Sequence, residues 1–247
     1  MGVKVVSIVV GDNYMHLFYE EEAAFCIDAC NPKVLLKALG INFKKKIYSE
    51  KEILSMPEDM TKKRRLVYLF TTHKHQDHSC GIPYIMENSP DTQRISGFEG
   101  NICKCGDKFH FREVEIECLY TPCHTMDSFC YYVDGRFLAT GDTLFFLGCG
   151  KFFEGTPEQM IEAIMKIRGR VNNEAVLLYG HDYNEQNIRF TEELYPVPLE
   201  IKETKFLRLK DEMEYNPFFN LRRIFTKGSE EEMMGNLRER KNRFNRT

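Results

Sequence analysis

Three of the seven histidines in this chain lie within six residues of one another, directly after a continuous apolar run. The segment from 71 to 81 reads TTHKHQDHSCG, and residues 66–70 before it read LVYLF. Five apolar residues that end at polar ones are typical of a buried strand. Imidazole and carboxylate groups suit Zn, Fe or Mn, so their density after a strand end predicts a metal site.

Three later predicted strands are also followed by a histidine or an aspartate. These strands are 113–120, 136–140 and 175–180, and the residues that follow them are His124, Asp142 and His181. If the strand ends lie at one edge of a sheet, the side chains converge, because a rigid scaffold holds the loops there. The candidate metal ligands are His73, His75, Asp77, His78, His124, Asp142 and His181.

Seven candidate ligands exceed the needs of one tetrahedral ion and suit two divalent ions bridged by a carboxylate and a hydroxide. We assign the three histidines 73, 75 and 124 to one ion, and Asp77, His78 and His181 to the second. Asp142 bridges the two ions, and Asp77 and Asp142 are the predicted catalytic carboxylates. We expect Zn, with Fe or Mn as alternatives, because nitrogen and oxygen ligands accept all three.

Single residues of this set have ordinary structural interpretations, and only the repeated placement after strands favours metal binding. His16 and His110 lack such neighbours, so we assign them structural roles. Asp28, in FCIDAC after an early strand, is a candidate hydrogen-bond partner for a metal ligand, with a loop or cap role as the alternative.

Short strands and helices alternate along the chain, which predicts a mixed α/β fold. Asp134-Gly135 predicts a hairpin turn between FCYYV and RFLAT. Asn31 and Pro32 are expected to begin one helix, which ends before Gly40, and a capping box at Thr156 and Gln159 is expected to begin another.

Two regions fall outside this alternation. Residues 41–65 contain KKK and KKRR with no clear apolar period, which predicts a solvated surface insertion. Strand signals stop near residue 183, so we expect a catalytic domain over 1–182 and a helical, substrate-binding domain over 183–247.

Composition narrows the class of protein. With 43% hydrophobic residues and a net charge of -3, the chain is globular and is not a general nucleic-acid binder. The last 47 residues, however, carry 12 Lys and Arg against 8 Asp and Glu, which leaves room for an anionic partner there. No signal peptide or apolar run of 18 residues is found, so we expect a cytoplasmic monomer with no membrane contact and reduced cysteines.

THKHQDH resembles the THxHxDH signature of the metallo-β-lactamase superfamily. TPCHT, GDTLFFLGCGKFFEGT, GHDYNEQN and YNPF are similar to segments of the glyoxalase II, or hydroxyacylglutathione hydrolase, family, and the resemblance runs from residue 12 to the carboxyl terminus. It implies an αββα sandwich with a carboxyl-terminal helical domain and a binuclear metal centre with the ligands given above. The implied reaction is hydrolysis of S-D-lactoylglutathione to glutathione and D-lactate by a metal-bridging hydroxide, a step in methylglyoxal detoxification.

The same resemblance implies a glutathione site, whose cationic side chains would meet the carboxylates of the tripeptide. Its residues are Lys151, Phe153, Tyr183, Arg238 and Lys241. Phe153 stands where many members have tyrosine, which removes one hydroxyl from the site. An alternative interpretation makes Arg238 and Lys241 solvated charges of a helix.

Three other functions fit parts of the pattern. A persulfide dioxygenase shares the superfamily fold but uses one iron, and the additional ligands and the carboxyl-terminal extension disfavour it. A nucleic-acid hydrolase of the same superfamily would be consistent with KKRR but not with the acidic remainder of the chain. Non-catalytic metal binding predicts a site with no open position.

Overall fold

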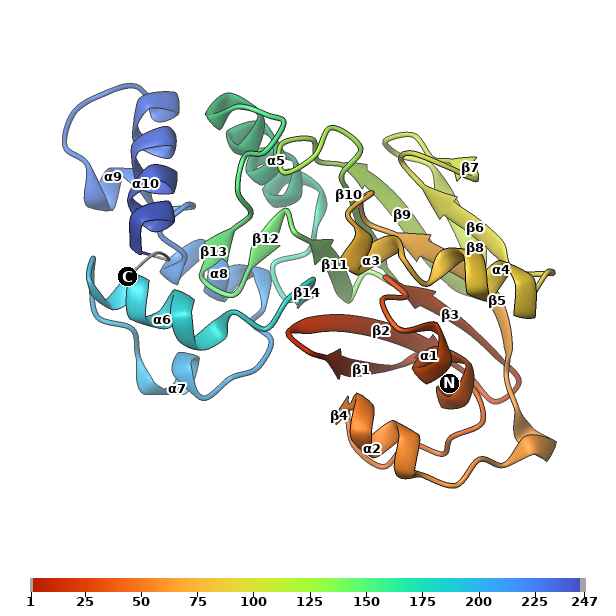
Figure 1. Ribbon diagram of the computed structural model, residues 1–247. Helices are drawn as coiled ribbons and strands as arrows, with labels where there is room; N and C mark the ends of the chain where they lie inside the picture. Colours follow the sequence, from red (N-terminus) through yellow and green to blue (C-terminus); the bar gives the residue numbers. More distant parts are fainter. Residues whose placement is uncertain (1, 245–247) are drawn as a thin grey trace.

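Two β-sheets face each other in the computed structural model, which describes residues 2–244, and helices cover their outer faces (Figure 1). In spatial order, the first sheet contains β4 (Ile47–Ser49), β1 (Lys4–Val10), β2 (Asn13–Tyr19), β3 (Ala23–Ile27), β5 (Arg65–Thr71), β6 (Gln93–Ser96) and β7 (Asn101–Ile102). The second contains β14 (Val176–Tyr179), β11 (Phe137–Gly141), β10 (Phe129–Val133), β9 (Val114–Tyr120) and β8 (Lys108–Phe111). A short hairpin joins β12 (Leu144–Phe145) to β13 (Gly148–Cys149).

The helices follow the same layering. Those within the first 170 residues are α1 (Pro32–Ala38), α2 (Glu50–Ser55), α3 (Gln76–Ser79), α4 (Ile82–Asn88) and α5 (Pro157–Arg170), with a 3-10 turn at Met60–Lys62. The carboxyl-terminal ones are α6 (Asn184–Glu192), α7 (Leu199–Lys202), α8 (Leu209–Tyr215), α9 (Leu221–Ile224) and α10 (Glu230–Phe244). Among the described residues, none of these helices is both long enough and apolar enough to cross a bilayer.

Three apolar clusters explain why the strands read as nearly continuous apolar runs. One cluster lies between the sheets and includes Phe25, Phe70 and Tyr131. A second packs α1, α2 and α4 on the first sheet, and a third packs α5 and the carboxyl-terminal helices on the second. Strands buried on both faces need apolar residues at successive positions, as in β3, where all five residues are buried. The predicted αββα fold is therefore confirmed.

The local signals are confirmed at three places. Asp134 and Gly135 have φ of 55° and 63°, as a turn with two left-handed residues requires. The Asn31 side chain accepts from the Val34 N–H at the start of α1. At α5, the capping box of Thr156 and Gln159 is complete.

The prediction of a solvated insertion at 41–65 is right for most of its residues, which are exposed, but wrong for the part that joins the fold. Strand β4 pairs in parallel with β1 and extends the first sheet, and Tyr48 and Ile53 are buried. The Arg64 guanidinium is also buried, and hydrogen bonds to the carbonyls of Leu39 and Ile41 compensate for its lost hydration. A strand of three residues and a helix of six are too short to establish an apolar period, although the capping box of α2 at Ser49 and Glu52 was readable.

Beyond β14 the described chain is helical, as predicted. The third apolar cluster includes residues on both sides of position 183, such as Leu144 and Leu209, and the division into domains at that position stays a prediction.

A buried carboxyl joins these helices to the β12–β13 hairpin. Glu212 on α8 is fully buried and accepts from the Leu147 N–H at 3.1 Å and the Tyr179 hydroxyl at 2.7 Å. The Asn216 amide donates to the same carboxyl at 2.6 Å and to the Gly148 carbonyl at 3.1 Å. Burial outweighs these hydrogen bonds and raises the pKa of Glu212 to about 7.

Replacing Glu212 with Gln is expected to remove one source of pH dependence from folding. The pKa of Glu212 rises from 4.5 to about 7 on folding, so its stabilising contribution is complete below pH 4.5 and is lost as the pH rises to about 7. The free energy of unfolding, taken relative to Glu212→Gln, should fall by about 3 kcal/mol across this range. Urea denaturation at a series of pH values measures it. Glu214→Gln, an exposed carboxyl on the same helix, is the control; parallel pH profiles for the unmodified protein and Glu212→Gln would contradict the assignment.

Candidate metal centre

The seven predicted ligands meet between the two sheets, not along one edge of a single sheet as expected. The loop from His73 to His78 follows β5 of the first sheet. His124, Asp142 and His181 follow β9, β11 and β14 of the second. The prediction of one shared edge is therefore wrong, because sequence patterns give strand ends but not the sheet to which each strand belongs.

Three histidines form the first group. The distance from His73 Nε2 to His75 Nδ1 is 3.0 Å, and the distance from His75 Nδ1 to His124 Nε2 is also 3.0 Å. The second ring nitrogen of His124, Nδ1, lies 3.0 Å from the Lys151 carbonyl and therefore carries the proton that this oxygen accepts. Its Nε2 lone pair is thus directed at the other two rings.

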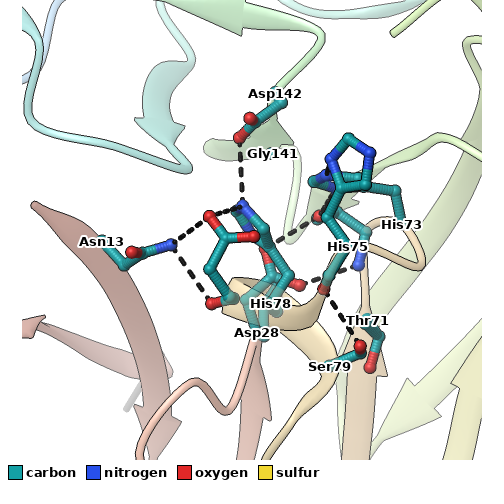
Figure 2. Close-up of polar contacts among 12 residues, drawn as sticks. Asn13, Asp28, Thr71, His73, His75, His78, Ser79, Gly141 and Asp142 are labelled. Carbon is teal, nitrogen blue, oxygen red and sulfur yellow. Dashed lines mark hydrogen bonds and ion pairs between the residues drawn. The ribbon is translucent and has the colours of Figure 1, made fainter. Parts of the chain in front are cut away.

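Asp77, His78 and His181 form the second group. The His78 and His181 Nε2 atoms are 3.2 Å apart, and Asp77 Oδ2 lies 3.2 Å from His181 Nε2. The Asp142 carboxylate contacts both groups, since its Oδ2 is 3.4 Å from His124 and its Oδ1 is 3.2 Å from His78 (Figure 2). The geometry agrees with the ligand partition assigned from the sequence, which stays a prediction.

Burial and charge act in opposite directions within this cluster. Burial lowers the pKa of His73 well below its ordinary value, and the neighbouring His78 adds to the shift. At His78 burial also disfavours the charge, but the carboxylates of Asp142 and Asp28 outweigh it and raise the pKa well above its ordinary value. The site therefore favours positive charge beside Asp142, which a bound cation would supply.

The donor set fits divalent cations. Two pairs of ring nitrogens face each other at 3.0 Å in the first group, and hydrogen bonds among them cannot satisfy every lone pair. His181 Nδ1 is buried without a hydrogen-bond partner among the described residues, and the one group that faces Asp142 Oδ1 closely there is His78 Nε2, at 3.2 Å. Imidazole nitrogens and carboxylate oxygens at such spacing indicate divalent-metal binding.

Asp28 hydrogen-bonds a candidate ligand, His78, on the side of the ring away from the other ligands, as the sequence predicted. Its carboxylate lies 3.0 Å from His78 Nδ1 and accepts from the Thr72 N–H and hydroxyl, both at 2.8 Å. Because Nδ1 donates to this carboxylate, Nε2 is the His78 nitrogen that faces Asp142 and is left to bind a metal. The Asp28 backbone has φ of 59°, an uncommon value for a residue other than glycine, which shows that its neighbours fix it in place.

Sequence reasoning missed Asn13 and Lys74. The Asn13 amide donates to the Asp77 carbonyl and Oδ2 at 3.1 and 3.2 Å (Figure 2). The Lys74 N–H donates to Asp127 and its ammonium pairs with Glu154 at 2.6 Å, which ties the histidine loop to the loops around it. No spacing rule connects residues this far apart, although Asn13 lies within the DNYMHL segment where the family resemblance begins.

All five predicted glutathione-site residues line one pocket next to the ligands. The pocket walls include Lys151, Phe153, Tyr183, Arg238 and Lys241. The Phe153 ring is 61% exposed and contacts His75 and His124 edge-on, with ring centroids 5.6 and 5.2 Å apart. Tyr183 stacks on His181 at 4.8 Å. The open side of the candidate-ligand cluster is therefore bordered by aromatic rings and cations.

The alternative interpretation of Arg238 and Lys241 as solvated charges is wrong. Both side chains are buried, at 5% and 3% exposure. Arg238 donates to the Cys149 carbonyl at 2.7 Å and Lys241 to the Gln186 carbonyl at 3.3 Å, and neither forms an ion pair within residues 2–244. Burial, together with the nearby Arg238, lowers the pKa of Lys241 to about 7. Two buried cations without a carboxylate make this pocket attractive to anions.

An αββα sandwich that carries an H-x-H-x-D-H loop where its two sheets meet has the metallo-β-lactamase fold. Two solved structures share this fold. ETHE1 from Myxococcus xanthus aligns with a TM-score of 0.66 at 20% identity, over 96% of this chain and 90% of its own. A metallo-beta-lactamase from Staphylococcus aureus aligns with a TM-score of 0.66 at 14% identity, over 96% of this chain and 66% of its own. At these identities the likeness concerns the fold alone.

Curated relatives narrow the class, although no protein-family model matches. The chain is 68% identical over 248 residues to a probable hydroxyacylglutathione hydrolase of Encephalitozoon cuniculi, and each sequence is covered completely. It is 38% identical over 189 residues to the cytoplasmic isozyme of hydroxyacylglutathione hydrolase from Saccharomyces cerevisiae, over 62% of this chain and 69% of the relative. The chain belongs to the hydroxyacylglutathione hydrolase, or glyoxalase II, family.

Asp28→Asn is expected to weaken metal binding without unfolding the protein. The variant replaces one carboxylate oxygen with an NH₂ group, and the remaining oxygen cannot accept from both the Thr72 N–H and His78, so the His78 ring loses its fixed orientation. Loss of such a partner costs about 10- to 100-fold in metal affinity. Competition with a chromophoric chelator measures this loss. Asp134→Asn, the same exchange in the hairpin turn, is the control, and equal affinities for the two variants would rule out the role given to Asp28.

Proposed function

We propose that this protein hydrolyses S-D-lactoylglutathione to glutathione and D-lactate, with two divalent metal ions, preferably zinc, held by the seven ligands assigned above. The observation that carries the proposal is one pocket in which the ligand cluster, two aromatic rings and two buried cations lie together. Membership of the hydroxyacylglutathione hydrolase family supports the substrate class. We also propose that the protein is a cytoplasmic monomer, with a catalytic region over 1–182 and a substrate-binding region over 183–247.

Metal ions bound at such a site make hydroxide available near neutral pH and polarise a carbonyl oxygen. The residues of the chain orient the reactants. Asp28 and the Lys151 carbonyl fix the rings of His78 and His124, and Asn13 fixes the Asp77 carboxylate. A thiol has a pKa of about 8.5, so glutathione leaves as the thiolate without a dedicated general acid.

Arg238 and Lys241 account for selection of a glutathione thioester in this proposal. Glutathione carries two carboxylates, and both cations lack an acidic partner among the described residues. A substrate carboxylate would replace part of the hydration that burial removes from these cations. Lys151, whose ammonium lies 5.8 Å from the centre of the Phe153 ring, adds a third positive charge on the exposed side of the pocket.

The activity is tested with the metal-loaded protein and its Asp142→Ala variant. We expect hydrolysis of S-D-lactoylglutathione to be at least about 100-fold slower in the variant, because Asp142 contacts both ligand groups. Release of thiol measures the rate, and Asp91→Ala, in an exposed loop, is the control. Oxygen uptake without thioester cleavage would instead favour a dioxygenase, and equal rates for all proteins would refute the assignment.

Lys241→Gln is expected to raise KM for S-D-lactoylglutathione about tenfold, because one charged hydrogen bond to substrate is lost, with a smaller change in kcat. The lowered pKa of Lys241 makes KM of the unmodified protein rise as the pH increases through about 7, and the variant loses this dependence. Steady-state kinetics with a lactoyl thioester of N-acetylcysteamine supply the comparison, since that substrate lacks carboxylates. Lys210→Gln, an exposed lysine of α8, is the matched control. A KM increase of equal size for both substrates would disprove the contact.

A further inference from the structure

A second groove lies at the margin of the two sheets, beside β1 of the first sheet and β14 of the second. It has a volume of about 950 Å³ and is lined by β1, the segment 43–47, β11, β14 and the segment 204–211. None of its lining residues belongs to the pocket beside the metal ligands. The groove is therefore distinct from that pocket. Its lining includes the KKK segment, which has no role in the proposed reaction.

The floor of the groove is apolar and aromatic. Val5, Phe137, Val176 and Phe206 belong to the margin of the core between the sheets, and each is only partly buried. Phe43 lies beside them in the wall, partly exposed, and packs on Tyr19 with ring centroids 5.1 Å apart. Flat apolar groups can pack against these rings.

The rim of the groove is strongly basic. Its cations are Lys4, Lys44, Lys45, Lys46, Arg136, Lys205 and Arg208, and Asp211 is the one acidic residue among the lining residues that the structure describes. Four of the cations pair with carboxylates outside the groove, which are Glu52, Asp134, Asp182 and Glu174. Asp211 is itself engaged, because it accepts from the Arg208 N–H at 3.1 Å.

Three lysines remain without a counter-charge. Lys4, Lys44 and Lys46 are exposed, and within residues 2–244 none of them forms an ion pair. The KKK backbone is nevertheless fixed, since the N–H groups of Lys44 and Lys45 donate to the Tyr48 hydroxyl at 2.7 and 3.0 Å. Three unneutralised ammonium groups on a fixed segment and a neighbouring strand attract an occupant with several negative charges.

We propose that this groove binds a nucleoside polyphosphate, with its phosphates on the three unpaired lysines and its base against the aromatic floor. Three unpaired positive charges in the lining of one groove match a polyphosphate better than the single charge of a fatty acid. A groove of about 950 Å³ has the size of a small-molecule site. Stacking of a base on aromatic side chains is favourable for every base, so the site selects the class of ligand and not one nucleotide.

The absence of tryptophan from this chain provides a clean test. Phe43→Trp places the one tryptophan of the chain in the groove wall, where it can be excited selectively over the 12 tyrosines, and ATP without added metal is the probe. We expect a saturable change in fluorescence with Kd below about 1 mM, and about tenfold weaker binding when Lys44→Gln and Lys46→Gln are added. Lys62→Gln with Lys63→Gln, the same charge change in KKRR outside the groove, should leave Kd unchanged. Calorimetry on the chain without the reporter should give the same Kd.

Four results would overturn the proposal. These are no saturable signal, an equal loss of affinity in the Lys62 and Lys63 control, displacement of ATP by S-D-lactoylglutathione, and binding of inorganic tripolyphosphate as tight as that of ATP. The third result would place ATP in the pocket beside the metal ligands. The fourth would show that charge alone acts and that the apolar floor contributes nothing. A fifth result, tighter binding of dodecanoate than of ATP, would also overturn it and replace the proposed class of ligand with fatty acids.

Discussion

The structure depends on holding seven ionisable side chains together between two sheets, where burial disfavours their charges. Close approach of the backbone makes this possible at Gly141 and Gly180. A Cβ atom at Gly180 would lie 2.5 Å from Asp142 Oδ1, and one at Gly141, where φ is 49°, would lie 2.5 Å from the Thr72 hydroxyl. Asp28 then fixes both Thr72 and His78. The ligand geometry is therefore imposed by the chain, and a metal ion would find it already formed.

The carboxyl-terminal helices contact the same cluster through the segment between Asp142 and Lys151. Glu212 of α8 accepts from the Leu147 N–H within this segment, and Arg238 of α10 donates to the Cys149 carbonyl near its end. The Lys151 carbonyl in turn receives the Nδ1 proton of His124. One stretch of ten residues thus connects a metal-ligand loop, an anion-attracting helix and a buried carboxyl. This segment therefore connects predicted substrate-binding residues to predicted metal ligands through hydrogen bonds.

Much of the fold and the candidate site could be predicted, because the signals are local. The strand before His73, the Asp134-Gly135 turn and the cap at Asn31 each depend on neighbouring residues. The expectation that the strand ends lie at one sheet edge failed because it depends on long-range strand pairing. Strand β4 was not predicted because three residues are too few to show an alternation of apolar and polar positions. Asn13 was missed because an amide that orients Asp77 looks the same in sequence as any loop asparagine.

Charge composition predicted an anionic partner near the carboxyl end but could not say which cations would meet it. The structure separates them by burial and pairing. Arg240 and Arg243 on α10 form ion pairs with Glu193 and Glu239, whereas Arg238 and Lys241 on the same helix are buried and form none within residues 2–244. In the KKK segment, Lys45 pairs with Glu52 while its two neighbours do not. A cation that the fold leaves unneutralised retains its attraction for a ligand, and counting charges along the sequence cannot reveal which ones these are.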